Sequence, residues 1–267
     1  MNPIVLAPTS LSSAPPMEYI DAAVEAGYDG IGIRLFRSPG INYAFHPVAG
    51  DDTLERQVKT KLFGANMPVY DILSYYLQPE MDIESMKPSL EYGAEIGARY
   101  ALVIGDDPDW DRQVQNFGRF CEVTKGFGLT SSIEAPVTQR QVNTLDKALN
   151  LIKESGADNA CVCLDPFHYF RTGHSPDQLK GQDPKLFPYT QIDDGLDNVP
   201  APGGRCAPGE GLVPLDAILD ALPANLPLSL EYAAGRDSGH TAESWAKTAI
   251  AATKKYLDGY YARKAKA

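Results

Sequence analysis

The chain has 267 residues, of which 43% are hydrophobic, so it can bury a large core as one (β/α)8 barrel or as two modest domains. Its 35 acidic residues outnumber its 24 basic residues, and the formal net charge of -11 repels phosphate polymers and anionic membrane surfaces. Neither nucleic acid nor a membrane is therefore expected as a partner.

The cysteine content and the amino-terminal segment indicate where the protein works. Four cysteines are too few and too irregularly spaced for a disulfide framework, and Cys161 and Cys163 lie inside an apolar segment rather than in a zinc knuckle. The first residues show no basic segment followed by an apolar stretch, and no apolar run approaches the length that spans a bilayer. We therefore expect reduced core thiols in a soluble, cytoplasmic protein.

Apolar segments of strand-like composition alternate with segments of helical spacing along the whole chain. The eight predicted strands cover residues 4–7, 30–35, 67–72, 101–104, 130–134, 160–164, 188–193 and 226–231. The predicted helices cover residues 15–26, 52–63, 83–96, 110–127, 145–155, 175–179, 215–222 and 241–264. Eight strand-then-helix units favour a closed barrel over an open doubly wound sheet. The sequence therefore predicts one domain, residues 1–267, with the (β/α)8 TIM-barrel fold of the α/β class.

The segment from Cys161 to Phe170 places an acid and a histidine directly after an apolar strand. Asp165 stands at the carboxyl end of that strand, and His168 follows in the next turn of chain. A carboxylate in apolar surroundings is costly unless it is paired or holds a metal, so a cation is expected beside Asp165. The alternative is that Asp165 only caps the turn that begins at Pro166.

Three other predicted strands also end in a group that can bind a cation. Glu134 ends the fifth strand, Gln191 and Asp193 lie at the end of the seventh, and Glu231 ends the eighth. A closed parallel barrel brings such ends together over its carboxyl-terminal mouth, although they are far apart in sequence. The pattern therefore predicts a cation site at that mouth.

The longest irregular segment, residues 194–212, contains the run Gly203-Gly-Arg-Cys-Ala-Pro-Gly-Glu-Gly211. A loop of this length in a compact barrel is usually functional, and Arg205 offers a planar fork of donors for a carboxylate, a phosphate or an enolate oxygen. A solvated arginine in a flexible lid is the alternative. Glu210 is equally suited to starting a helix or to supporting the site as a nearby carboxylate. Arg34, near the end of the second strand, is a second predicted substrate-binding arginine.

The candidate residues combine into a recognisable set. It consists of Glu134, of Asp165 and His168 in a D-x-x-H arrangement, of Gln191 and Asp193, of the R-x-x-x-G-E-G run from Arg205 to Gly211, and of Glu231. This set resembles the sugar-phosphate isomerase/epimerase superfamily, the xylose-isomerase-like TIM barrels, and the resemblance covers essentially the whole chain. In that family the fifth to eighth strands supply Glu, Asp, usually His, and Glu to one divalent cation.

The resemblance implies four metal ligands, which are Glu134, Asp165, Gln191 and Glu231. Gln191 departs from the family, in which histidine is commoner at this strand, but an amide oxygen still coordinates a cation. Three carboxylates and one carbonyl form a hard site, so the implied cofactor is one Mn²⁺ or Mg²⁺ ion, with Co²⁺ a further candidate. The endonuclease IV branch of the family is set aside, because it assembles three zinc ions with many histidines and this chain has 4.

The implied activity is that of a metal-dependent isomerase or epimerase acting on a keto sugar or a related polyol. The cation would stabilise the enediolate formed when a proton leaves the carbon next to the carbonyl, while Glu134 and Glu231 act as base and acid on its two faces. His168 would hydrogen-bond a substrate oxygen, unless it is a core histidine. Asp193 would orient His168 or the Arg205 loop, unless it is an exposed cap.

Two further classes of function stay open. Glutamine at the seventh strand is similar to family members that act as 3-dehydroshikimate dehydratases, so a metal-dependent lyase acting on a cyclic keto acid or an inosose is the alternative enzyme. A catalytically silent sugar-binding barrel is the non-enzyme alternative, although all four ligand positions keep oxygen donors. The sequence does not distinguish a monomer from a homo-oligomer.

Overall fold

The computed structural model describes residues 1–267 apart from 42–45, 47, 197–198, 200–202, 234–238 and 267. The strands of its main sheet are β1 Ile4–Leu6, β2 Gly30–Ile33, β3 Val69–Leu77, β4 Tyr100–Gly105, β5 Thr130–Glu134, β6 Ala160–Val162, β7 Thr190–Ile192 and β10 Leu228–Leu230, and a separate ribbon pairs β8 Asp194–Gly195 with β9 Arg205–Cys206. The helices are α1 Pro16–Ala26, α2 Asp52–Gly64, α3 Ile83–Glu95, α4 Trp110–Gly126, α5 Leu145–Ser155, α6 Pro166–Arg171, α7 Leu215–Ala221 and α8 Ala242–Lys264, with short 3-10 turns at Pro8–Leu11, Pro176–Leu179 and Pro184–Leu186.

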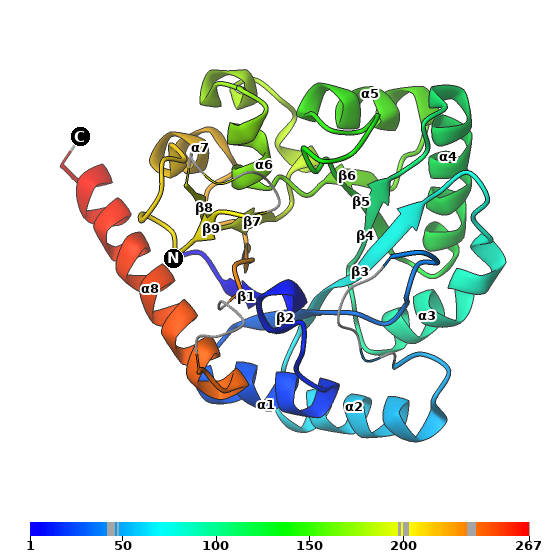
Figure 1. The fold of residues 1–267 in the computed structure, drawn as a ribbon, viewed down its shortest axis with the longest axis horizontal. Coiled ribbons are helices and arrows are strands. Elements are labelled where there is room, and N and C mark those ends of the chain that lie inside the picture. The colour runs from blue at the N-terminus through cyan, green and yellow to red at the C-terminus, as the bar shows by residue number, and fades with distance from the viewer. Residues whose placement is uncertain (42–45, 47, 197–198, 200–202, 234–238, 267) are drawn as a thin grey trace.

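Eight parallel strands form one sheet in the order β6-β5-β4-β3-β2-β1-β10-β7, and the helices surround it (Figure 1). A parallel bridge between Leu164 and Thr190 joins the two ends of this sheet, and the main-chain N–H of Gln191 donates to the Leu164 carbonyl at 2.8 Å. The sheet therefore closes on itself, which confirms the predicted (β/α)8 TIM barrel. Among the described residues, no helix is both long and apolar enough to cross a membrane.

The apolar side chains lie in two layers because successive residues of a strand point to opposite faces. Along β4, Ala101 and Val103 belong to the large cluster between barrel and helices. Leu102 and Ile104 belong to a smaller cluster with Leu73, Cys163 and Tyr189, which fills the barrel interior below the mouth. Strands buried on both faces read as continuous apolar runs, and for that reason the sequence located them well.

Two predicted boundaries near the mouth of the barrel are wrong. The third strand was predicted to end at Ile72, but β3 continues to Leu77, so Ser74, Tyr75 and Tyr76 lie in the strand and not in a loop beyond it. The segment 194–212 was predicted to be irregular, but it contains the antiparallel ribbon of β8 and β9. Strands of two residues carry no detectable periodicity, so this ribbon left no signal in the sequence.

The sixth helical segment also differs from the prediction. The predicted helix 175–179 is only a 3-10 turn, Pro176–Leu179, whereas the helix after β6 is α6, which begins at Pro166. The Asp165 side chain accepts from the His168 amide at 3.2 Å and so caps this helix, and proline is favoured in the first turn. A helix of six residues is too short for a 3.6-residue pattern to show, but the cap and the proline were visible in the sequence.

Candidate metal centre and active site

The four predicted ligand residues come from consecutive strand ends of the barrel. Glu134 is the last residue of β5, Asp165 lies just beyond β6, Gln191 lies within β7, and Glu231 directly follows β10. All four side chains are buried. Since parallel strands open at the same end of the barrel, residues far apart in sequence meet over one mouth, as the spacing predicted.

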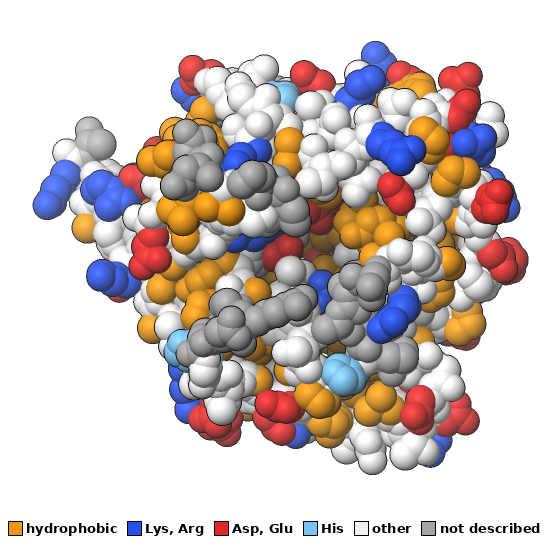
Figure 2. Space-filling model, viewed as in Figure 1, with side chains coloured by type: hydrophobic (Ala, Val, Ile, Leu, Met, Phe, Trp, Pro, Cys, Tyr) orange, Lys and Arg blue, Asp and Glu red, His pale blue; other side chains and the backbone are white. Residues whose placement is uncertain are grey.

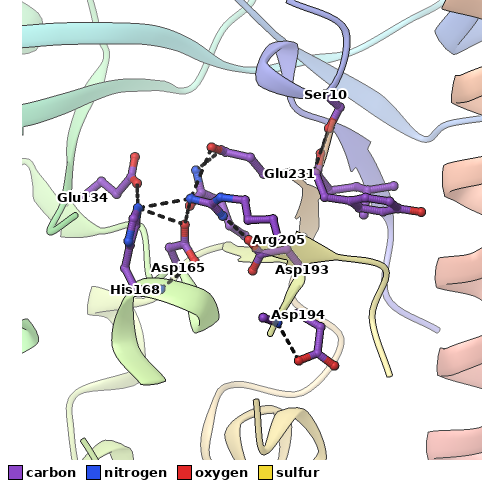
Figure 3. Close-up of polar contacts among 12 residues, drawn as sticks. Ser10, Glu134, Asp165, His168, Asp193, Asp194, Arg205 and Glu231 are labelled. Atoms are coloured by element: carbon purple, nitrogen blue, oxygen red, sulfur yellow. Dashed lines mark hydrogen bonds and ion pairs between the residues drawn. The ribbon is translucent and has the colours of Figure 1, made fainter. Parts of the chain in front are cut away.

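Glu134, Asp165 and His168 form the tightest group (Figure 3). Each offers one atom that can bind a metal, and these atoms lie within 4.8 Å of one another. The Nε2 atom of His168 is 3.8 Å from Glu134 Oε1 and 3.7 Å from Asp165 Oδ2. His168 therefore lies at the predicted site. It is as buried as a core histidine, but its Nε2 atom faces two acids and not the apolar core.

Gln191 and Glu231 make a second pair beside this group. The amide nitrogen of Gln191 donates a hydrogen bond to the Glu231 carboxylate. Its oxygen, Oε1, is buried and has no hydrogen-bond partner among the described residues. A buried acceptor without a partner costs free energy unless something cationic or a donor meets it, so this oxygen is suited to a metal ion.

Arg205 of β9 lies between the two groups. Its Nη2 atom is 2.7 Å from Asp165 Oδ2, 3.1 Å from His168 Nε2 and 3.7 Å from Glu231 Oε1. Its Nη1 atom donates to Asp193. The guanidinium also stacks on the ring of Phe167, 4.7 Å from the ring centre. Arg205 is thus an ordered part of the site, and the alternative of a solvated lid arginine is wrong.

The contacts of Asp165 and Asp193 resolve two alternatives that the sequence left open. Asp165 both caps α6 and pairs with Arg205, so the two interpretations of this residue hold together. Asp193 is fully buried and bonded to Arg205, which excludes an exposed cap. Glu210 is exposed in a turn and begins no helix.

Burial and mutual repulsion control the protonation of the acids. Burial, followed by the charges of Glu231 and Asp165, raises the pKa of Glu134 well above its usual value, and burial also raises the pKa of Glu231 and Asp193. Burial is the largest single influence on Asp165 and would raise its pKa, but the Arg205 guanidinium, His168 and the hydrogen bonds from both residues together hold that pKa below its usual value.

His168 is neutral at ordinary pH, because burial lowers its pKa to about 4. Since Arg205 donates to its Nε2 atom, the ring proton resides on Nδ1. The neutral ring presents an acceptor to the site and adds no positive charge to it.

The donor set fits a divalent cation. Four buried carboxylates face one guanidinium, so the ionised cluster is strongly negative. A doubly charged ion there would favour the ionised carboxylates by Coulomb attraction, and would so lower the pKa values of Glu134 and Glu231 that burial and the neighbouring acids raise. Carboxylate oxygens and the unpartnered Gln191 oxygen are the ligands that hard cations such as Mg²⁺ and Mn²⁺ prefer.

A cavity of about 520 Å³ opens over the cluster. Its wall includes Glu134, His168, Arg205 and Glu231, and beyond them Thr9, Arg34, Leu73, Tyr76, Ile104 and Gln139. Figure 2 shows this hollow at the centre of the face, where acidic side chains adjoin hydrophobic ones. The cavity therefore has a charged side and an apolar side.

Arg34, the second arginine predicted to bind substrate, lies on this wall. Its Nη2 atom donates to the Thr9 hydroxyl at 2.8 Å. Sequence reasoning missed Leu73, Tyr76 and Ile104 as wall residues, because it ended the third strand too early and treated the apolar residues as core. It also missed Thr9, which lies in a 3-10 turn that was not predicted from the sequence. An apolar residue at a strand end carries no sequence signal that separates pocket wall from core.

Comparison with known proteins identifies the family. The family model described as xylose isomerase-like TIM barrel matches residues 20–256, so the chain belongs to that family.

Among curated relatives, an inosose isomerase of Bacillus velezensis is 29% identical over 151 residues, which are 54% of each chain. The match covers 54% of the length of this relative and 38% of the length of a second inosose isomerase, from Bacillus subtilis. Among solved structures, the IOLI protein with a bound zinc atom superposes with a TM-score of 0.77 at 21% identity, covering 97% of this chain and 99% of the other. The probable 3-DHS dehydratase AsbF of Bacillus anthracis superposes with a TM-score of 0.71 at 18% identity, covering 97% and 99%. These structural likenesses show the fold.

Proposed function

We propose that the protein is a divalent-metal-dependent isomerase or epimerase that removes a proton next to the carbonyl of a small keto sugar or polyol. The observation that carries this proposal is the pair of buried glutamates, Glu134 and Glu231, which face one cavity from strands on either side of Asp165 and Gln191. The partial likeness to inosose isomerases supports the same class of reaction.

One Mn²⁺ or Mg²⁺ ion, or Co²⁺ in their place, would be held by Glu134, Asp165, Gln191 and Glu231. The bound ion would stabilise the negative charge that develops on the substrate oxygen as the proton leaves. The unpartnered Gln191 oxygen is the feature of this chain that favours an ion at this place.

The two glutamates divide the proton transfer between them. One carboxylate takes the proton as the carbon–hydrogen bond breaks, and the electron pair of that bond forms the double bond of an enediolate. The other glutamate returns a proton. Return to the neighbouring carbon gives an isomer, in which the hydroxyl on the first carbon loses its proton to become the new carbonyl and the former carbonyl oxygen gains one. Return to the opposite face of the same carbon restores the original carbonyl and gives an epimer.

The remaining polar residues bind and orient the substrate. The neutral His168 ring lies among the acids and lines the cavity, where it can form a hydrogen bond with a substrate oxygen. Arg205 and Arg34 offer donors from two sides of the same cavity to substrate oxygens. Since Arg205 is fixed by Asp165, Asp193 and Phe167, it can meet a substrate without first being ordered.

Dehydration is the second candidate reaction, and the composition of the cavity favours it. Two arginines suit a substrate with a carboxylate, and the apolar side formed by Leu73 and Ile104 suits a ring that lacks hydroxyl groups on one edge. The fold is shared with a probable 3-DHS dehydratase. In this reaction one glutamate removes the proton, the electron pair of the carbon–hydrogen bond forms a carbon–carbon double bond, and the carbon–oxygen bond of the next carbon breaks. The other glutamate gives its proton to the departing hydroxyl group, which leaves as water.

Solvent deuterium exchange tests the shared step. The protein, loaded with Mn²⁺, is incubated in deuterated buffer with an inosose, D-allulose or 3-dehydroshikimate, and the α-hydrogen is followed by NMR. We expect exchange into the true substrate or its isomer, and we expect Glu134→Gln and Glu231→Gln to lose it while circular dichroism stays native. Growth of an ultraviolet-absorbing conjugated product would identify the dehydratase instead.

Glu122→Gln is the matched control, because Glu122 is an exposed residue of α4 far from the cavity wall. This variant should catalyse exchange of the substrate's α-hydrogen at the same rate as the unaltered protein. In a second experiment the substrate carries deuterium at the α-carbon and the buffer is ordinary water. If the product keeps that deuterium, and Glu134→Gln and Glu231→Gln turn over at the normal rate, this mechanism is excluded.

A further inference from the structure

Asp194 is a buried acid that the proposed reaction does not use. It follows Asp193 and begins β8, and its side chain is 1% exposed. Its carboxylate accepts from three main-chain amides: Oδ1 from Gly195 at 2.8 Å and Val213 at 2.9 Å, and Oδ2 from Gly209 at 3.0 Å. One carboxylate thus links the first residues of β8 to the chain that follows β9, at Gly209 and Val213.

The chain packs closely around this carboxylate. A Cβ atom on Gly211 would meet Asp194 Oδ1 and would lie 2.5 Å from the Gly195 carbonyl oxygen, so only glycine fits. The Leu212 amide donates to that same Gly195 carbonyl at 2.9 Å. Gly211 of the R-x-x-x-G-E-G run therefore lets the loop close around Asp194, and Gly209 contributes its main-chain amide.

The fixed segment is the one that carries Arg205. Gly195 pairs with Arg205 across the ribbon, and Asp194 pairs with Cys206. The two neighbouring acids then have separate tasks, because Asp193 holds the guanidinium while Asp194 holds the main chain from which it extends (Figure 3). Hydrogen bonds to a charged acceptor are stronger than those between neutral groups, so three of them constrain the segment effectively.

We propose that Asp194 is a positioning residue that acts through Arg205, by fixing the β8–β9 ribbon so that the guanidinium stands ready in the site. A shift of a substrate-binding group by about 1 Å can lower turnover strongly, even when the altered residue itself touches no reacting atom. This inference rests on the proposed function only where turnover is measured, because the order of the loop is observable without any substrate.

The first test follows the loop itself. Asp194→Asn keeps the size of the side chain but turns an NH₂ group toward at least one of the three amide donors. We expect faster hydrogen exchange in peptides that span residues 204–213, read by mass spectrometry, and averaging of the Arg205 guanidinium resonances in ¹⁵N NMR. Asp258→Asn, which neutralises an exposed acid of α8, is the matched control and should leave both signals unchanged.

The second test separates positioning from general stability. In a double-mutant cycle on the substrate found by deuterium exchange, Asp194→Asn should lower kcat/KM by about tenfold when Arg205 is present and by much less in an Arg205→Lys background. An equal factor in both backgrounds would overturn the proposal, and so would unchanged loop exchange and unchanged arginine resonances. Should Asp194→Asn fail to fold, Gly211→Ala provides the same test, because its methyl group displaces the Asp194 oxygen.

The outcomes distinguish this inference from the proposed function. A loop that loosens in Asp194→Asn, in a protein that exchanges no hydrogen with any of the substrates, would support positioning and contradict the proposed reaction. Exchange activity with an unaffected loop would do the opposite.

Discussion

Asp71 offers a sharp prediction because it is an acid buried inside the barrel. It belongs to β3, is 2% exposed, and accepts from the Tyr189 hydroxyl at 3.2 Å through Oδ2. Its other oxygen has no hydrogen-bond partner within the part of the chain that the structure describes. Burial is the largest cause that raises its pKa, from 3.8 to about 7.

The sign of the effect on stability follows from proton binding. Between pH 4 and pH 7 the folded protein keeps a proton on Asp71 that the unfolded chain has released, so the free energy of unfolding falls as the pH rises through this window. The loss amounts to about 4 kcal/mol over the whole window, and about 2.7 kcal/mol of it falls above pH 5. Above pH 7 this contribution no longer changes.

Asp71→Asn should remove this dependence, because asparagine resembles the neutral acid in size and cannot ionise. Urea denaturation of both proteins at pH 5 and pH 8, with the same metal content, measures the difference in their free energies of unfolding. That difference should move by about 2 to 3 kcal/mol in favour of the variant as the pH rises. Exposed Asp258 provides the control, since Asp258→Asn should shift stability equally at both pH values. A constant difference for Asp71→Asn would mean that Asp71 is ionised in the fold, and would refute the reasoning.

Two further predictions concern the site. Gln191→His should keep a metal site but move its preference toward softer ions such as Co²⁺ or Zn²⁺, because imidazole suits those metals; unchanged relative affinities in competition titrations would place Gln191 outside the ligand set. Arg205→Lys should reduce kcat/KM most for substrates that carry a carboxylate or phosphate, because a point charge replaces the planar fork; equal losses across charged and neutral substrates would contradict a role in binding anions.

The sequence revealed the barrel because its determinants are local. Parallel strands such as β4 are buried on both faces and read as apolar runs. Helix ends such as that of α1 carry a glycine suited to the left-handed conformation, and Gly27 there has φ 76°. The site residues at strand ends could also be placed, because the fold dictates where those ends meet.

Other parts of the site depend on contacts that no local pattern encodes. The pairing of Arg205 with Asp193 and Asp165 depends on a two-residue ribbon, and helix α6 is only six residues long. The apolar side of the cavity depends on β3 reaching Leu77, and its hydrophobic residues look like core in the sequence. Tertiary contacts, rather than periodicity, determine these features.

Metal content is the most direct test of the proposed centre. The protein and its Glu231→Gln and Glu122→Gln variants are saturated with Mn²⁺, dialysed and analysed by mass spectrometry of the metal. We expect one ion per chain in the unaltered protein and in Glu122→Gln, and a sharp fall in Glu231→Gln, because one charged ligand is lost. Stoichiometric retention of the ion by Glu231→Gln, with full activity, would contradict the assignment of the ligands and with it the proposed mechanism.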